Sequence, residues 1–228
     1  MTLLPPEELA GLWEPERPYL NTASYGLPPR PAFEALQAAL DEWRRGRTSW
    51  ESWTTAVARA RASFASLVGC EPDDVATGAT VSELVGIVAA SLPAGSQVLA
   101  AEVEFASTIF PWLAQEGIET RLVPLERLVE SIDERTTLVA VSAVQSADGR
   151  IADLAALRRA APLLLVDATQ ACGWLPLQGH GADFLVCHSY KWLLSPRGAA
   201  FMAVRPERLD TLAPFHAGWW AAEDPYGS

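Results

Sequence analysis

Residues 163–191 read LLLVDATQACGWLPLQGHGADFLVCHSYK and hold two short apolar runs, 163–166 and 183–187. Each run has the length and the Leu and Val content of a buried strand. Asp167 directly follows the first run, and Lys191 comes shortly after the second. An acid and a lysine at the ends of two predicted strands are the pattern from which the rest of the chain is interpreted.

The same kind of run recurs on both sides of this stretch, at 97–101, 119–123, 137–144 and 199–204. Helical periodicity between the runs predicts helices over 81–91, 106–116, 125–131 and 152–161. Strands that alternate with helices of about ten residues are typical of βαβ units and of a largely parallel sheet. The run at 199–204 follows Gly198 without a helix, and we expect it to pair antiparallel at the end of the sheet.

Two further helices are predicted before residue 75. Apolar residues at positions 33, 36, 40 and 43 share one helical face and follow Pro31, which suits the first turn of a helix. A second face is formed by apolar residues at positions 53, 57, 60, 64 and 67, with Gly69 in the place of a C-cap.

The chain has 228 residues, with 17 Lys and Arg against 28 Asp and Glu and a formal net charge of −11. A hydrophobic content of 50% and a charged content of 20% are those of a folded globular protein. The acidic excess argues against nucleic acid or an anionic membrane as partner, because both attract Lys and Arg patches. No CxxC, HExxH or HxxxH spacing predicts a disulfide framework or a metal site. Neither a signal-peptide pattern nor a membrane-length apolar run is present, so a cytoplasmic location is expected.

Ligands of open α/β sheets bind beyond the carboxyl ends of the strands, and the residues there form a coherent set. Lys191 has apolar neighbours on both sides, which lower the pKa of an amine and favour Schiff-base chemistry. Asp167 ends an apolar strand and needs a cationic partner, which a protonated pyridine nitrogen would supply. The two residues are placed to hold the ends of a pyridoxal phosphate ring. The phosphate would lie at Ala79 and Thr80, where a helix begins, with Phe105 stacked on the ring.

Simpler roles stay open for several of these residues. Asp167 taken alone would be interpreted as a cap or loop residue, and Thr80 as the N-cap of the following helix. Phe105 and His188 also fit ordinary core positions. The stretch 179–184 imitates the start of a GxGxxG motif, but it precedes a strand, which argues against a dinucleotide site.

Longer motifs make the pattern specific: Asp167-Ala-Thr-Gln170, Ser189-Tyr-Lys-Trp-Leu-Leu-Ser-Pro-Arg-Gly198, Tyr19-Leu-Asn-Thr-Ala-Ser-Tyr-Gly26 and Gly78-Ala-Thr80. Together they resemble the class V aminotransferase family of fold type I pyridoxal-phosphate enzymes. That family includes cysteine desulfurases, kynureninases and isopenicillin N epimerase-like proteins. The resemblance covers nearly the whole chain. It implies an α/β fold with a mostly parallel, seven-stranded sheet flanked by helices in three αβα layers, and pyridoxal 5'-phosphate as cofactor.

The resemblance also implies roles for the matching residues. Lys191 is the Schiff-base lysine and the proton-transfer group, and Asp167 pairs with the pyridinium nitrogen of the cofactor. Gln170 lies by the phenolic oxygen, with Gln145 as a second candidate for that neighbourhood. Phe105 takes the stacking position.

The phosphate is implied to lie at Ala79 and Thr80. His188 and Tyr190 stand where desulfurases have Ser and His, and a tyrosine directly before the lysine is similar to kynureninase. The later motif around Trp219 is also similar to kynureninase, in which a tryptophan of this motif reaches a phosphate, often across a dimer interface.

Family members carry a further C-terminal domain. We therefore expect an N-terminal segment (1–30), a cofactor-binding large domain (31–213) and the start of a missing C-terminal domain (214–228). The implied function is that of a pyridoxal-phosphate-dependent enzyme on a small amino-acid substrate, by transamination, C–S lysis, desulfuration or epimerisation. A homodimer is expected, because family active sites lie at a dimer interface. The alternatives are a truncated, non-catalytic remnant that binds cofactor or a partner and, more distantly, a dinucleotide-dependent oxidoreductase.

Overall fold

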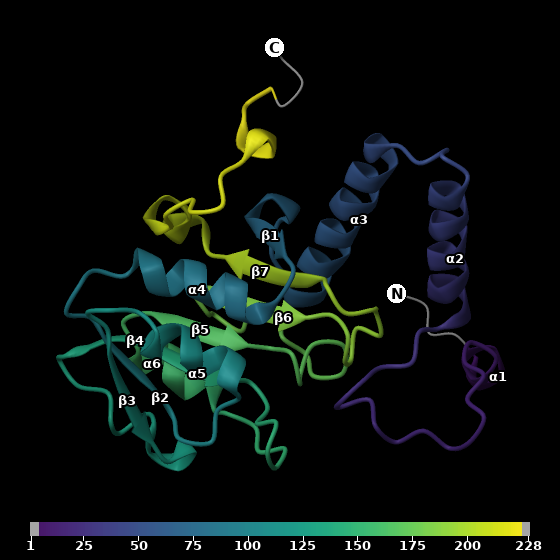
Figure 1. Ribbon diagram of the computed structural model, residues 1–228. Coiled ribbons are helices and arrows are strands. Elements are labelled where there is room, and N and C mark those ends of the chain that lie inside the picture. Colours follow the sequence, from purple (N-terminus) through teal and green to yellow (C-terminus); the bar gives the residue numbers. More distant parts are fainter. Residues whose placement is uncertain (1–4, 225–228) are drawn as a thin grey trace.

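The computed structural model describes residues 5–224, which contain one sheet of seven strands (Figure 1). The strands are β1 (Val75–Gly78), β2 (Gln97–Ala101), β3 (Glu119–Val123), β4 (Thr136–Ser142), β5 (Leu164–Asp167), β6 (Phe184–His188) and β7 (Ala200–Val204). Their order across the sheet is β1-β7-β6-β5-β4-β2-β3. Strand β7 is antiparallel to both its neighbours, β1 and β6, and the other adjacent strands pair in parallel, so the predicted mostly parallel sheet is confirmed.

The helices within the described residues are α1 (Pro6–Ala10), α2 (Arg30–Arg44), α3 (Trp50–Val68), α4 (Val81–Ser91), α5 (Ala106–Leu113) and α6 (Leu154–Ala160). Short 3-10 turns lie at η1 (Pro72–Asp74), η2 (Leu125–Arg127), η3 (Pro206–Thr211) and η4 (Trp219–Ala221). The predicted helix at 81–91 is confirmed with both ends. Gly69 caps α3 in the left-handed conformation, at φ +80°, as its position after the helix predicts.

Three predictions about elements need correction. Strand β1 was not predicted, because its sequence VATG is short and only partly apolar; it forms by pairing with β7. The antiparallel strand β7 therefore lies one place inside the edge, not at the end of the sheet. The predicted helix 125–131 is only the 3-10 turn η2, and α5 ends at Leu113 rather than at 116.

The core consists of two apolar clusters, one on each face of the sheet. Helices α4 and α5 pack on one face, with Leu84, Val85 and Trp112 fully buried. The C-terminal half of α3 and helix α6 cover the other face. Each central strand alternates its side chains between the two clusters, so the strands are buried on both sides, as parallel strands usually are. The predicted three-layer αβα arrangement is confirmed.

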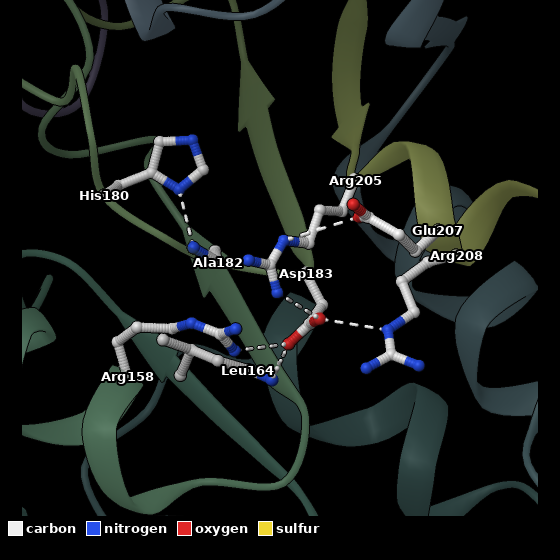
Figure 2. Close-up of polar contacts among 8 residues, drawn as sticks. All are labelled: Arg158, Leu164, His180, Ala182, Asp183, Arg205, Glu207 and Arg208. Carbon is white, nitrogen blue, oxygen red and sulfur yellow. Dashed lines mark hydrogen bonds and ion pairs between the residues drawn. The ribbon is translucent and has the colours of Figure 1, made fainter.

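A buried carboxylate ties together the amino-terminal edge of the sheet (Figure 2). Asp183, just before β6, is fully buried and accepts a hydrogen bond from the backbone N–H of Leu164 at 2.9 Å. Three guanidinium groups also contact it: Arg208 at 3.0 Å, Arg158 at 3.3 Å and Arg205 at 3.4 Å. The cluster joins β5 and β6 to α6 and to the segment after β7.

Helix α2 contrasts with the sheet-packed helices, because none of its residues is buried. Its predicted apolar face is present but exposed, with Trp43 at 66% and Phe33 at 49% exposure. In Figure 1, α2 and the beginning of α3 extend away from the sheet. Large apolar faces that remain in water are uncommon in proteins that function as monomers.

Candidate functional site

A cleft opens at the carboxyl edge of the sheet. The parallel strands β4, β5 and β6 end there, and the first residues of α4 and α5 close its sides. Six of the residues predicted from the sequence line this cleft: Phe105, Asp167, Gln170, His188, Tyr190 and Lys191. The fold thus brings together residues that are up to 86 positions apart in the chain (191 − 105).

Asp167 is held rigidly at the end of β5. Its side chain is 5% exposed, and its Oδ2 accepts a hydrogen bond from the hydroxyl of Thr108 on α5 at 2.9 Å. Its Oδ1 accepts the backbone N–H of Thr169 at 2.8 Å. Two neutral donors satisfy part of the carboxylate and leave its negative charge without a salt bridge among residues 5–224. A cation entering the cleft would therefore find an oriented, uncompensated acceptor.

Lys191 lies in the same cleft, with its amine over two aromatic rings. The residue is 5% exposed, and Nζ lies 5.3 Å from the centre of the Phe105 ring and 5.9 Å from that of Tyr190. Within the described chain it makes no salt bridge at 4 Å or less. Burial is the main cause that lowers its pKa; the negative charge of Asp167 acts against this and the positive charge of Arg197 adds to it. The neutral, nucleophilic form of the amine is therefore easier to reach than in a solvated lysine.

His188 and Tyr190 form the wall beside the lysine. Their rings meet edge to face with centres 4.4 Å apart, and the backbone N–H of His188 donates to Thr169 Oγ1 at 3.0 Å. The buried Nδ1 of His188 has no hydrogen-bond partner among the described residues. Burial is the main cause that lowers the pKa of this histidine, so the neutral ring is favoured.

Gln170 connects the cleft to the N-terminal segment. Its amide nitrogen donates to the carbonyl oxygen of Ala23 at 3.0 Å and to Ser146 Oγ at 3.2 Å. Its amide oxygen accepts the indole N–H of Trp192 at 2.9 Å. The amide is therefore fixed in orientation at the edge of the site.

The segment 19–26, one of the motifs that carry the family resemblance, packs on the turn that carries Lys191. The N–H of Gly26 donates to the carbonyl oxygen of Tyr190 at 2.8 Å. A Cβ atom at Gly26 would overlap the carbonyl oxygen of Lys191 and lie 2.8 Å from a Leu194 methyl group. Only glycine permits this close approach.

Ala79 and Thr80 lie at the start of α4, next to the cleft-lining Val81. The hydroxyl of Thr80 accepts the N–H of Glu83 at 3.2 Å, and the Glu83 carboxylate accepts the N–H of Ala79 at 2.8 Å. The Thr80 side chain thus caps α4, as its position predicts, and Glu83 binds the N–H of the residue before the cap. The Ala79 N–H is already engaged by the Glu83 carboxylate.

Gln145 and Trp219, like Ala79 and Thr80, are predicted site residues that do not line the cleft. Gln145 is 1% exposed and donates to Glu104 at 2.6 Å, while its own amide oxygen has no partner within residues 5–224. Glu104 also accepts the N–H and hydroxyl of Ser142, and burial raises the pKa of its carboxyl group. Trp219 lies in η4, with its ring 5.1 Å from that of Trp220. The proposed reach of Trp219 to a phosphate stays a prediction.

Sequence reasoning missed several polar residues of the site. Thr108, which orients Asp167, lies 59 positions before it and carries no local signal of that contact. Thr169 belongs to the quoted DATQ motif and is recognisable only from its proximity to Asp167. The remaining polar residues of the cleft wall are Ser107, Ser142 and Ser146.

Comparison with known families decides what kind of chain this is. The family model described as "Aminotransferase class-V" matches residues 33–225. The chain belongs to the class V aminotransferase family. The resemblance predicted from the motifs around Asp167 and Lys191 is confirmed.

Individual proteins that are similar to this chain support the family assignment. An uncharacterized aminotransferase, YcbU, of Bacillus subtilis is 31% identical, over 91% of this chain and 60% of its own length. Isopenicillin N epimerase of Streptomyces clavuligerus is 31% identical, over 97% of this chain and 62% of its own length. A solved structure of the cystine C–S lyase C-DES with its reaction product cysteine persulfide superposes with a TM-score of 0.80. Its 24% identity, over 88% of this chain and 60% of that one, shows the shared fold.

The chain spans about 60% of the length of these class V relatives. Within residues 5–224, no three His, Cys, Asp or Glu side chains come together as a metal site would require. In the same part of the chain, no helix has the length and apolar character needed to cross a bilayer. The predicted cytoplasmic location and the predicted domain limits stay predictions.

Proposed function

We propose that the chain binds pyridoxal 5'-phosphate and acts on an amino-acid substrate through Lys191. The observation that carries this proposal is that two buried, chemically complementary groups line the same cleft. A buried lysine amine with a lowered pKa and no salt bridge in the described chain lies beside a buried carboxylate, Asp167, that only neutral donors satisfy.

The residues of the cleft fit this cofactor chemically. Asp167 offers an oriented acceptor for a protonated ring nitrogen, and Phe105 offers an aromatic face next to the amine. Lys191 offers the amine that would bind the aldehyde carbon. His188 Nδ1, buried and unpartnered in residues 5–224, would gain a partner in the phosphate or its hydration water. The start of α4 adds a helix N-terminus, although one N–H there is engaged by Glu83.

The bound cofactor would withdraw electrons from the α-carbon of an amino acid and so weaken its C–H bond. Lys191, with its lowered pKa, would accept and return the proton at that carbon. Asp167, fixed by Thr108 and Thr169, would keep the ring nitrogen protonated, and Gln170 would face the ring from the edge of the cleft. Phe105 would cover one side and exclude water.

Transamination, C–S lysis or desulfuration, and epimerisation all begin with that proton transfer. The relatives named above include an aminotransferase and an epimerase, and other similar proteins are a cysteine desulfurase of Methanothermobacter thermautotrophicus and a kynureninase of Stenotrophomonas maltophilia. The proposal therefore extends to the shared step, with a small amino acid as substrate.

A homodimer is part of the proposal. The exposed face of α2 presents Phe33, Leu36, Leu40 and Trp43 at 41–66% exposure, and Trp53 on α3 is 53% exposed. A second copy that covers this surface would remove apolar area from water, which stabilises the dimer by about 25 cal/mol for each Å² buried. Light scattering at micromolar concentration tests this point, and a monodisperse monomer would contradict it.

A covalent-trapping experiment tests the cofactor proposal directly. Lys191 is the only lysine in the 228-residue sequence, so the chain offers a single side-chain amine besides its N-terminus. Incubation with pyridoxal phosphate, borohydride reduction and peptide mass spectrometry should locate one adduct on Lys191. Lys191→Arg, which keeps the charge but cannot form the bond, should lose that adduct. An adduct at the N-terminus alone would contradict the proposal.

A further inference from the structure

An arginine at the rim of the cleft has no role in the site described so far. Arg197 follows Lys191 in the turn before β7, and its guanidinium carbon lies 4.6 Å from the ring centre of Tyr190 and 5.0 Å from that of Tyr25. The two rings are 5.4 Å apart. Tyr190 is itself a wall of the cleft, so the guanidinium lies one side chain away from the site.

The charge of Arg197 is not neutralised within the described residues. No carboxylate of residues 5–224 lies within 4 Å of its nitrogens, whereas Arg158, Arg205 and Arg208 all engage Asp183. Its positive charge is nevertheless close to the reactive groups, because it contributes to lowering the pKa of both Lys191 and His188. In a chain with a net charge of −11, an uncompensated cation next to the site invites an anion.

The contacts of Arg197 leave its hydrogen-bonding edge free. A cation–π contact uses the flat face of a guanidinium, whereas its N–H donors point outward in the plane as a fork that matches a carboxylate. Besides its contacts with the rings of Tyr25 and Tyr190, the Arg197 guanidinium makes no hydrogen bond to residues 5–224, so its N–H donors remain for a ligand.

The turn that carries Arg197 is itself fixed. Leu194 adopts φ +60°, a left-handed conformation that is rare for a leucine. Ser195 donates its N–H to the carbonyl oxygen of Ser189 at 3.2 Å, and its hydroxyl bonds to the Ser189 hydroxyl. Gly26 packs against Leu194 from the N-terminal segment. Strained backbone held by such contacts is typical of a turn that positions a functional group.

We propose that Arg197 binds an acidic group on the side chain of the amino-acid substrate, so that the site prefers amino acids with an acidic side chain. This inference rests on the proposed function, because it places the substrate between Lys191 and the rim. The tyrosine rings orient the guanidinium, and its fork receives the side-chain carboxylate in a charge-assisted, bidentate contact. A neutral amide of the same shape cannot replace that contact.

The test is a titration of the pyridoxal-phosphate-loaded chain with L-aspartate, L-asparagine and L-alanine, followed by calorimetry and by the visible spectrum. L-Aspartate should bind at least about tenfold more tightly than L-asparagine, which corresponds to about 1.4 kcal/mol. Arg197→Gln should abolish that preference, whereas the affinities for L-asparagine and L-alanine should stay the same. Arg159→Gln removes the same charge from an exposed position on α6 and should retain the preference. The preference should also weaken as salt is raised.

The outcomes separate the two proposals. If the borohydride adduct on Lys191 forms but L-aspartate is not preferred, the inference about Arg197 is wrong and the cofactor proposal stands. An equal loss of affinity for all three amino acids in Arg197→Gln also overturns it, because that result indicates binding of the α-carboxylate or general damage to the site. Absence of the adduct in the unmodified chain overturns both.

Discussion

Replacing the buried Asp183 by asparagine should destabilise the chain more than the same change of a carboxylate to an amide at its surface. The side chain is fully buried and serves as the common acceptor for one backbone N–H and three guanidinium groups (Figure 2). Asparagine has nearly the same volume, so the substitution removes charge and one acceptor oxygen without leaving a cavity.

The magnitude follows from the four contacts of Asp183. The bonds from Leu164 at 2.9 Å and Arg208 at 3.0 Å have good length, whereas those from Arg158 and Arg205 at 3.3 and 3.4 Å are weak. A hydrogen bond that involves a charged group contributes about 1.5–3 kcal/mol. The arginine side chains are about one-third exposed, so water replaces part of what they lose. A loss of about 3 kcal/mol in the free energy of unfolding is therefore expected, at the lower end of the range for a broken buried pair.

Urea unfolding followed by circular dichroism measures this loss, and the thermal midpoint should fall by roughly 6–12 °C. Asp210→Asn is the matched control, because Asp210 is an exposed residue of η3 and its substitution should change stability by less than about 0.5 kcal/mol. A loss below about 1 kcal/mol for Asp183→Asn would refute the reasoning. That result would mean that water replaces the hydrogen bonds of the three arginines and that the cluster contributes little to stability.

Two further predictions concern other parts of the chain. Burial lowers the pKa of His180 from 6.5 to about 4. The unfolded histidine therefore takes up a proton below pH 6.5, whereas the folded one does so only below about pH 4. The free energy of unfolding should fall by about 3 kcal/mol as the pH drops through this window. Urea midpoints measured from pH 7 to 4 check this, and His180→Asn should flatten the dependence. Gly26→Ala should displace the N-terminal segment at a cost of about 1–3 kcal/mol, because its methyl group would overlap the Lys191 carbonyl oxygen. Deuterium uptake of the peptide 19–29 should rise, whereas Gly11→Ala, where a Cβ has no contact closer than 3.6 Å, should leave it unchanged.

The sequence by itself determined the alternation of strands and helices and the end of the sheet at which the chemistry lies. Runs such as 163–166 and 183–187 became β5 and β6, because Leu and Val repeats of this length are buried on both faces. Asp167 and Lys191 were then placed at the same edge, because parallel strands end on one side of a sheet. Helix α4 and the glycine cap of α3 were likewise predictable, since capping and periodicity depend only on neighbouring residues.

Only the tertiary structure decided which groups touch. Strand β1 exists because β7 offers it a free edge, although its own sequence, VATG, predicts no strand. Thr108 orients Asp167 only because α5 packs over the end of β5. Asp183 gathers arginines from two separate segments, α6 and the stretch after β7, and Gly26 reaches Lys191 across 165 positions (191 − 26). A sequence pattern fixes the conformation and the buried face of each segment, but contacts between distant segments depend on the order of the strands and on the packing of the layers, which no local pattern contains.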